Sequence, residues 1–267
     1  MTYTTVQLDR RDHVAWLTLN RPQALNAMNR ALVNELRDFF SGLSTDAETR
    51  VVILQGAGRA FCAGLDLKES AGGDATNDGS VQAGLRMQRR ISELVIMMRR
   101  APQPIIACVQ GAACGGGFAL ALGADVRLAG ESARMNAAFI RIGLSACDVG
   151  VSYFLPRMVG ASVAAELLLT GNFIDAARAE RLGLVSRVVP DAELPAAAQA
   201  MADDMLRNSP IGLRLTKECL NASLDAGSLE QVIAMEDRNQ ILCTRTSDFR
   251  EGIGAFLQKR APQYEDQ

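Results

Sequence analysis

Three consecutive glycines at positions 115–117 separate two apolar runs, and this arrangement constrains the fold more than any other feature of the chain. The run Ile105–Val109 is typical of a buried strand, and residues 118–122 are typical of the first turns of a buried helix. Residues 125–129 then predict a second strand. The chain is therefore expected to run from a strand through a glycine turn into a helix and back into a sheet.

A glycine turn between a strand and a helix is one way for a backbone to bind an anion. The first N–H groups of a helix have no acceptor within the helix, and the aligned peptide dipoles leave positive potential at that end. Glycine also allows a ligand to approach the bare backbone closely. The alternative is that the glycines only let the helix pack tightly against the sheet, and from this stretch alone both interpretations stay open.

Composition excludes several classes of function. The 267 residues are 48% apolar, which is enough for one large domain or for a domain with an appendage. A net charge of −2 provides no basic field for nucleic acid or anionic lipid. No apolar run approaches the length that crosses a bilayer, and residues 1–11 lack the layout of a signal peptide, so a cytoplasmic protein is expected.

Cysteine and histidine usage argues against a metal centre. The six cysteines form no Cys-x-x-Cys pair, and without a secretory signal they are expected to be free thiols. The single histidine, His13, and the scattered acids have no metal-ligand spacing, so we expect no metal. A mechanism that needs a histidine base would have to use His13, which is expected at the start of the first hairpin.

The order of the predicted elements divides the chain. Strand and helix patterns alternate over residues 1–190, which predicts an α/β core, and only helical patterns follow over residues 191–267. This helical region carries more apolar residues than an isolated appendage needs, among them Leu229, Val232 and Ile241. We interpret it as an oligomerisation element, with packing on the chain's own core as the alternative.

Five segments share the order and spacing of one known family. They are residues 20–28, 60–67, 111–117, 169–171 and 183–189, and the second contains the sequence Phe61-Cys-Ala-Gly64. Together they resemble the enoyl-CoA hydratase/isomerase (crotonase) superfamily over nearly the whole chain. The resemblance implies an α/β fold with a crotonase-like ββα spiral core and a C-terminal all-helical oligomerisation region, assembled as a homotrimer or a dimer of trimers.

The resemblance also implies a substrate, an acyl-CoA thioester and in particular an enoyl-CoA. No further cofactor is implied, since coenzyme A is part of the substrate. In the family two backbone N–H groups bind the thioester carbonyl oxygen, and we match them to Ala63 and Gly116. Negative charge develops on that oxygen when a proton is removed beside the thioester, and fixed donors stabilise it. The anion site anticipated at the glycine turn would serve this purpose.

Further positions are implied as substrate contacts, because family members line the coenzyme A groups there. The full set of implied contacts is Ala24, Leu25, Ala63, Gly64, Leu65, Asp66, Gly116 and Phe139. Asp66 has an alternative role as the cap of a short helix at Leu67, and the cap is the preferred interpretation.

Both acids of the family's hydratases are absent here. Those enzymes hold and activate water with two glutamates, and the matching positions are Ala119 and Phe139. One carboxylate remains nearby, Asp148, which resembles an aspartate in the Asp-Val-Gly segment of dienoyl-CoA isomerases and falls near the nucleophilic aspartate of chlorobenzoyl-CoA dehalogenases. Asp148 is therefore the candidate acid/base. Its alternative role is to cap the turn or helix at Val149, and both interpretations stay open.

Three hypotheses about function follow. The first is a hydratase/isomerase-type enzyme that uses an oxyanion hole and Asp148. The second is an acyl-CoA-binding protein of the same fold that has lost the chemistry, which the two missing glutamates favour. The third is a serine peptidase of the related Clp-type fold, which would need a Ser–His pair and has only His13 available.

Overall fold

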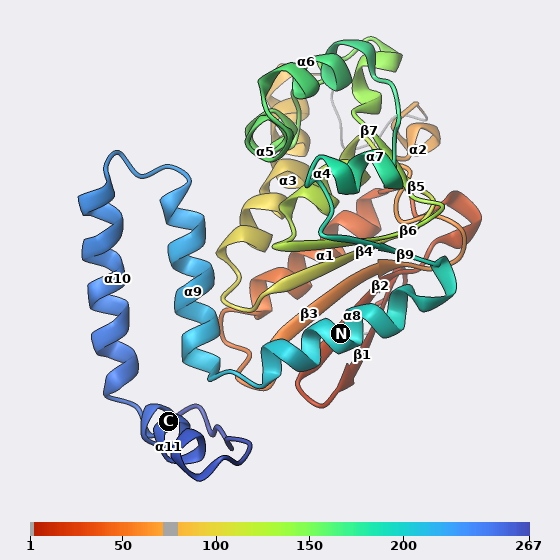
Figure 1. The fold of residues 1–267 in the computed structure, drawn as a ribbon. Coiled ribbons are helices and arrows are strands. Elements are labelled where there is room, and N and C mark those ends of the chain that lie inside the picture. The colour runs from red at the N-terminus through yellow and green to blue at the C-terminus, as the bar shows by residue number, and fades with distance from the viewer. Residues whose placement is uncertain (1–2, 72–79) are drawn as a thin grey trace.

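A six-stranded sheet in the order β1-β2-β3-β4-β6-β9 carries the apolar runs of the sequence (Figure 1). The computed structural model describes residues 3–71 and 80–267. β1 is antiparallel to β2, and the other neighbours in the sheet are parallel. The strands are β1 Val6–Arg11, β2 Val14–Leu19, β3 Val51–Gly56, β4 Ile105–Val109, β6 Val126–Gly130 and β9 Arg187–Val189.

Helices cover both faces of this sheet, as continuous apolar strands require. Ala15 and Leu17 of β2 belong to the larger core cluster, together with residues of three helices, whereas Val14 and Trp16 pack with α8 on the opposite face. Figure 1 shows α8 on one side of the sheet and those three helices on the other. The helices are α1 Arg30–Gly42, α3 Val81–Arg100, α4 Gly116–Gly123 and α8 Leu194–Leu206.

The strands β5, β7 and β8 form a smaller sheet, and its first strand, β5, directly follows β4 of the large sheet. The glycine turn comes directly after β5 and so lies where the two sheets meet. Short helices surround this sheet (Figure 1). The elements are β5 Ala112–Cys114, β7 Arg134–Asn136, β8 Ile174–Asp175, η1 Pro22–Ala24, α2 Leu67–Ala71, η2 Ala138–Ile142, α5 Val151–Val159, α6 Ala161–Thr170 and α7 Ala176–Arg181.

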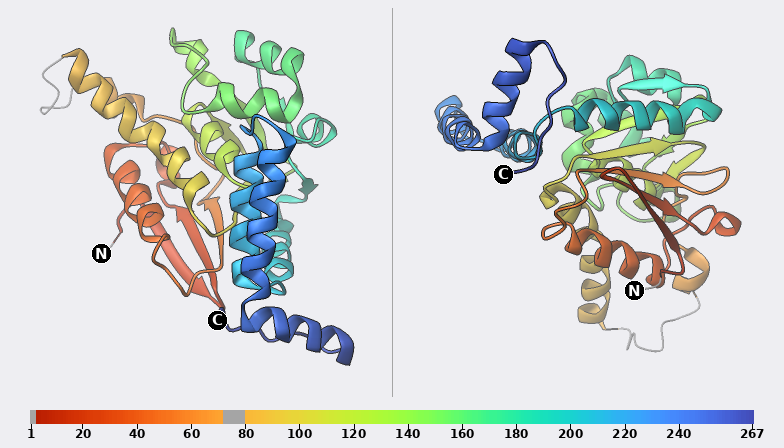
Figure 2. Two further views of the ribbon diagram at one scale, coloured as in Figure 1. Left: turned by 90° about the vertical axis from the view of Figure 1, so that its left-hand side faces the viewer. Right: turned by 90° about the horizontal axis from the view of Figure 1, so that it is seen from below.

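The predicted helical region forms helices as far as Gln258, and residues 259–267 follow without a helix, but these helices are not a single packing unit. It contains η3 Asp191–Glu193, α8, α9 Pro210–Ser223, α10 Leu229–Thr244 and α11 Ser247–Gln258. Because α8 packs on the sheet, it belongs to the core, and only α9, α10 and α11 extend from it as an arm (Figures 1 and 2). Lys217 of α9 attaches the arm, since its buried Nζ lies 2.8 Å from the Asp125 carboxylate.

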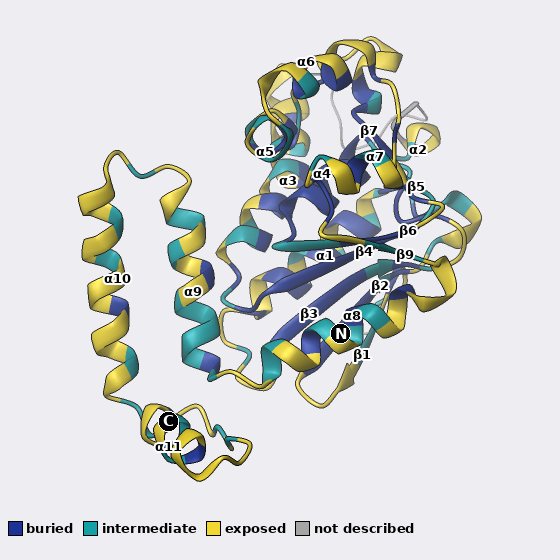
Figure 3. Ribbon diagram, in the orientation of Figure 1, coloured by how far each residue is buried: buried dark blue, intermediate teal, exposed yellow. Residues whose placement is uncertain are grey.

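The arm leaves large apolar side chains exposed in the single chain (Figure 3). They are Leu220, Leu224, Leu229, Ile233, Ile241, Leu242, Phe249, Ile253, Phe256 and Leu257. The chain's own core therefore does not cover them, and the alternative that this surface packs on that core is wrong for these side chains. Within the described residues, no helix is long and apolar enough to cross a membrane.

Candidate functional site

The glycine turn presents a helix start with an unbonded amide. Gly115 has φ 50°, and α4 begins at Gly116 without a side-chain cap. The Gly116 N–H has no acceptor among the residues that the structure describes, and every residue of α4 is buried. A free donor at the positive end of a helix, enclosed by protein, is the geometry that an anion site requires, and anion binding there stays a prediction.

The same glycines bring a second segment into contact with the turn. A Cβ on Gly117 would lie 2.1 Å from the Cys62 carbonyl oxygen, so α4 packs directly on the backbone of residue 62. A Cβ on Gly64 would lie 2.8 Å from the Cys114 carbonyl oxygen and 3.6 Å from the Gly116 nitrogen. The glycines do allow close packing, here on the segment around Cys62, and this packing coexists with the free Gly116 amide.

The structure contradicts one predicted donor, Ala63. Its N–H donates to the Leu25 carbonyl at 3.0 Å, so it is not available to a ligand. The Asp66 amide of the same segment is also bonded, because it donates to the Met28 carbonyl.

Leu65 supplies the free amide of this segment instead. Its N–H has no acceptor within the described part of the chain, and the residue is 38% exposed. Leu65 forms a parallel bridge with Met28, in which the Met28 amide donates to the Gly64 carbonyl and the Asp66 amide donates to the Met28 carbonyl. The Leu65 amide takes no part in this bridge. Since Gly64 touches the glycine turn, the Leu65 and Gly116 amides come from segments in direct contact.

A buried asparagine holds the loop that occupies the Ala63 amide. Leu25 and Asn26 both have left-handed φ angles, 52° and 55°. The Asn26 side chain donates to the carbonyls of Ala57 and Ala60 at 2.9 and 2.8 Å and accepts from the Arg21 amide. This arrangement fixes the Leu25 carbonyl, and with it the register of the segment that contains Leu65. Ala24 and Leu25 belong to this loop, and their predicted contact with substrate stays a prediction.

Asp66 is a helix cap and an ion-pair partner. Its Oδ1 accepts from the amides of Lys68 and Glu69 at the start of α2, and its Oδ2 lies 2.9 Å from the Arg21 guanidinium. Burial pushes the pKa of Asp66 upward, but the Arg21 and backbone hydrogen bonds outweigh it and hold the pKa below its ordinary value. The preferred cap interpretation is confirmed, whereas a substrate contact by Asp66 stays a prediction.

Apolar side chains occupy the two positions matched to the hydratase glutamates. Ala119 in α4 is fully buried, and Phe139 in η2 is 8% exposed. The Phe139 ring packs on the glycine turn, 3.4 Å from where a Cβ on Gly115 would stand. This part of the site therefore has no carboxylate at either position with which to hold water.

Asp148 lies between η2 and α5 and is half-buried. Its Oδ1 accepts from Gln88 Nε2 at 2.5 Å and from the Val149 amide at 2.8 Å. The predicted cap at Val149 is thus present, although α5 begins two residues later at Val151. Oδ2 has no partner among the described residues. Val149 has φ 46°, a strained conformation for a β-branched residue, and such strain is typical of functional sites.

Other candidate groups lie elsewhere or are unreactive. His13 lies in the β1–β2 turn, before the start of β2, whereas the glycine turn lies beyond the other end of the parallel strands β2, β3 and β4. The His13 Nδ1 is 2.8 Å from the Glu48 carbonyl. Burial raises the pKa of the Cys62 thiol to about 12, which argues against a thiolate there. No group of histidine, cysteine and acidic residues in the described parts of the chain has a metal-binding arrangement.

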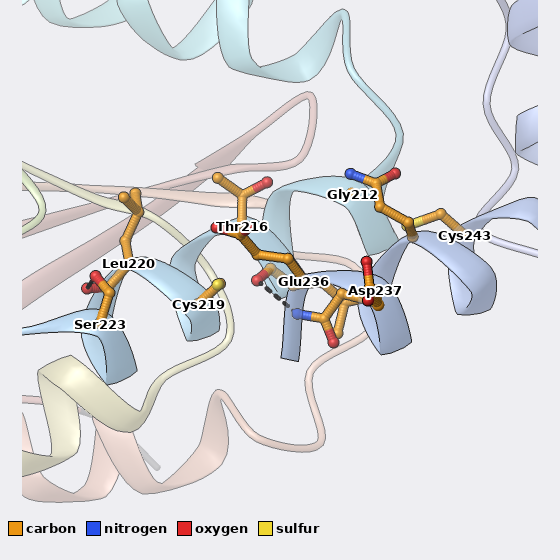
Figure 4. Close-up of a pocket in the computed structure, with 11 residues that line it drawn as sticks. Gly212, Thr216, Cys219, Leu220, Ser223, Glu236, Asp237 and Cys243 are labelled. Atoms are coloured by element: carbon orange, nitrogen blue, oxygen red, sulfur yellow. Dashed lines mark hydrogen bonds between the residues drawn. The ribbon is translucent and has the colours of Figure 1, made fainter. Parts of the chain in front are cut away.

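A separate cavity of about 500 Å³ lies in the arm between α9 and α10. Figure 4 shows its wall, with Cys219 and Leu220 on one helix and Cys243 on the other. None of its lining residues belongs to the predicted site. The cavity is a gap between the helices of the arm, and the site is defined by the glycine turn instead.

Comparison with known proteins identifies close relatives of the whole chain. A family model described as enoyl-CoA hydratase/isomerase matches residues 9–267. The chain is 42% identical over 259 residues to a probable enoyl-CoA hydratase of Mycobacterium bovis, covering 96% of this chain and 90% of the relative. It is 37% identical over 251 residues to the 1,2-epoxyphenylacetyl-CoA isomerase of Escherichia coli, with 94% of each covered. A solved enoyl-CoA hydratase of Bacillus anthracis matches with TM-score 0.93 and 35% identity over 99% of this chain and 100% of that one.

Proposed function

Because this chain belongs to the enoyl-CoA hydratase/isomerase family, we propose that it binds an acyl-CoA thioester and moves a proton beside the thioester carbonyl. The observation that carries the proposal is the pair of unbonded amides at Leu65 and Gly116, on segments that touch at Gly64. The carbonyl oxygen accepts from both amides, and each is expected to stabilise the enolate by about 3–4 kcal/mol. Leu65 thus replaces Ala63 as the second donor.

Asp148 is the proposed acid/base. Its Oδ2 takes a proton from the carbon next to the thioester, the C–H electron pair moves to the carbonyl oxygen as an enolate, and the two amides hold that charge. Returning the proton to the far end of the conjugated system shifts the double bond and restores the carboxylate. A single shuttling group completes this cycle, so isomerisation of an enoyl-CoA needs no second acid.

Hydration is the less favoured reaction of the two. Adding water requires a polar group that holds the water and another that deprotonates it, and the positions matched to these groups are the buried Ala119 and Phe139. One relative is named an isomerase of a CoA thioester. Its similarity over nearly the whole chain supports isomerase-type chemistry here.

The same apolar positions favour one alternative, an acyl-CoA-binding protein without catalysis. In that case the two amides would bind the thioester carbonyl, and the Asp148 carboxylate would serve only as the cap of the turn at Val149. The two functions differ in whether protons next to the thioester exchange with solvent.

We further propose that the protein works as a homotrimer or a dimer of trimers in the cytoplasm. The exposed apolar residues of the arm, such as Phe256 at 82% exposure, support an interface with copies of the same chain. No cofactor is needed beyond the coenzyme A of the substrate.

A backbone substitution tests the carbonyl-binding pair. Replacing one residue by its α-hydroxy acid converts the amide to an ester and deletes a single N–H with little change of volume. Esters at Leu65 and at Gly116 are each expected to lower turnover by about 10²–10³. An ester at Ala63 deletes the bond to Leu25 and is expected to lower stability more than turnover. Equal turnover in all three would refute the pair.

A panel of enoyl-CoA thioesters in deuterated water separates the enzyme from the binding protein. Deuterium incorporation beside the thioester, lost in Asp148→Asn with binding intact, is expected for the enzyme. Binding without exchange across all chain lengths would favour the non-catalytic alternative.

A further inference from the structure

A glutamine from a distant helix reaches the carboxylate of Asp148. Gln88 lies in α3, and its Nε2 donates to Asp148 Oδ1 at 2.5 Å across 60 residues of sequence. The orientation of the amide follows from charge, because the opposite one would set the Gln88 carbonyl oxygen against an ionised carboxylate. Since the acceptor is ionised, this hydrogen bond is stronger than a neutral one.

Both donors to Asp148 bind the same oxygen. The Val149 amide also reaches Oδ1, at 2.8 Å, so two directions fix the plane of the carboxylate. Oδ2 has no hydrogen bond or ion pair within the described residues, and no charged side chain described there pairs with Asp148. The two oxygens therefore differ: one is held, and the other is left with its lone pairs free.

The exposure of Gln88 indicates that core packing does not explain its contact with Asp148. The buried residues of α3 are Ala83, Ile91, Leu94, Val95 and Met98, whereas Gln88 is exposed. Gln88 therefore adds no apolar burial to the core, and its described contact is the hydrogen bond to Asp148.

We infer that Gln88 is a positioning residue, which holds Asp148 by Oδ1 so that Oδ2 is the oxygen that exchanges protons with substrate. This rests on the proposed function, in which Asp148 is the acid/base. When Oδ2 takes the proton, Oδ1 becomes the carbonyl oxygen of the acid and still accepts from Gln88 and Val149. The Asp148 side chain therefore keeps one orientation while Oδ2 takes up the proton and while it returns the proton. The cycle needs no second acid or base.

The test compares substitutions at two glutamines of the same helix. Gln88→Met keeps length without a donor, Gln88→Glu keeps shape and adds a repelling charge, and Gln82→Met is the control at an exposed position. The measurement is kcat and KM for conversion of vinylacetyl-CoA to crotonyl-CoA. We expect kcat to fall roughly tenfold in Gln88→Met and further in Gln88→Glu, with KM within about twofold. Gln82→Met should match the wild type.

A double-mutant cycle separates positioning from folding. In an Asp148→Asn background, Gln88→Met should leave the residual rate unchanged, because there is no proton-carrying group left to position. The same tenfold loss in that background, or kcat values in the Gln88 variants equal to that of Gln82→Met, would overturn the inference.

Crystal structures of the two Met variants decide the question without relying on turnover. Asp148 should leave its orientation in Gln88→Met and keep it in Gln82→Met, and an unchanged carboxylate in both would refute the positioning role. Wild-type turnover that survives Asp148→Asn, or no turnover by the wild type, would instead refute the proposed function. The failures of the two proposals are therefore distinguishable.

Discussion

The two halves of the proposed site are built from different parts of the chain. The backbone half consists of the Leu65 and Gly116 amides, which depend on close packing at Gly64 and Gly117. The side-chain half consists of Asp148, the Gln88 side chain that donates to it from α3, and Phe139 of η2, which packs on the glycine turn.

This difference indicates how one fold supports several reactions. In the backbone half, a substitution matters when an added Cβ would displace the neighbouring main chain, and it then disturbs the fold itself. In the side-chain half, a substitution changes the available chemistry and leaves the carbonyl site in place. Under the proposed function, the apolar residues Ala119 and Phe139 would remove a water site without affecting either amide.

The largest effect is expected from Gly117→Ala, which tests the backbone half. The new Cβ would lie 2.1 Å from the Cys62 carbonyl oxygen and 2.7 Å from the Cys62 Cβ. Because main chain cannot move aside cheaply, we expect a loss of roughly 3 kcal/mol in unfolding free energy, together with loss of acyl-CoA binding. Denaturant unfolding and a binding titration measure these effects.

Gly84→Ala is the matched control, since an added Cβ in α3 meets nothing within 4 Å. It should stabilise the protein by about 0.5–1 kcal/mol, because alanine restricts the unfolded chain more than glycine does. A Gly117→Ala protein as stable as the wild type, with binding intact, would show that close packing does not build this half.

Asp148→Asn is expected to have the next largest effect, and it tests the side-chain half. Turnover should fall by about 10²–10⁴, because the amide cannot carry the proton. Stability should stay within about 1 kcal/mol of the wild type, since the Asn oxygen can still accept from Val149 and Gln88. Rates and unfolding curves on the same protein give both values. A stability loss without a rate loss would leave Asp148 as a cap only.

Local patterns made much of the fold predictable from the sequence. Within the region predicted to be helical, α9 Pro210–Ser223 begins where Ser209 caps it and Pro210 suits a first turn. The short strands β5, β7 and β8 have only two or three residues each and depend on pairing partners elsewhere. No local pattern marks them, and none shows that α8 packs on the sheet whereas α9 does not.

The site was less predictable, because pairing register decides which amide is free. The family resemblance pointed to Ala63 as the donor, whereas the structure leaves Leu65 free because the Ala63 amide bonds the Leu25 carbonyl and Leu65 bridges Met28. Gln88 had no local signal, because an exposed polar residue is ordinary on the outer face of a helix. Its partner lies 60 residues away, so the contact itself could not be anticipated.

Asn26→Ala tests whether this register depends on one buried side chain. The substitution leaves the carbonyls of Ala57 and Ala60 without their donor, and we expect a loss of about 2–3 kcal/mol in stability with a fall in turnover. Asn29→Ala, which removes the cap of α1, should reduce stability by about 1 kcal/mol and leave turnover unchanged. Identical kinetics in both variants would mean that Asn26 does not govern the Leu65 amide.

The smallest effect is expected at Glu35, which lies in neither half. It accepts hydrogen bonds from the amides and hydroxyls of Thr4 and Thr5 and from the Val6 amide. Burial pushes the pKa of Glu35 upward, but these donors outweigh it and lower the pKa from 4.5 to about 2. A lowered pKa means that the stabilisation is present above the unfolded value and is lost as the pH falls toward 2.

Glu35→Gln should therefore lower the melting temperature at neutral pH, and the difference from the wild type should close as the pH approaches 2. Turnover at saturating substrate should equal that of the wild type, because Glu35 ties the N-terminal segment to α1 and touches neither half of the site. Melting curves across this pH range and one rate measurement test both statements. A reduced rate would mean that strain in the core reaches the catalytic groups, and the separation into two independent halves would then be wrong.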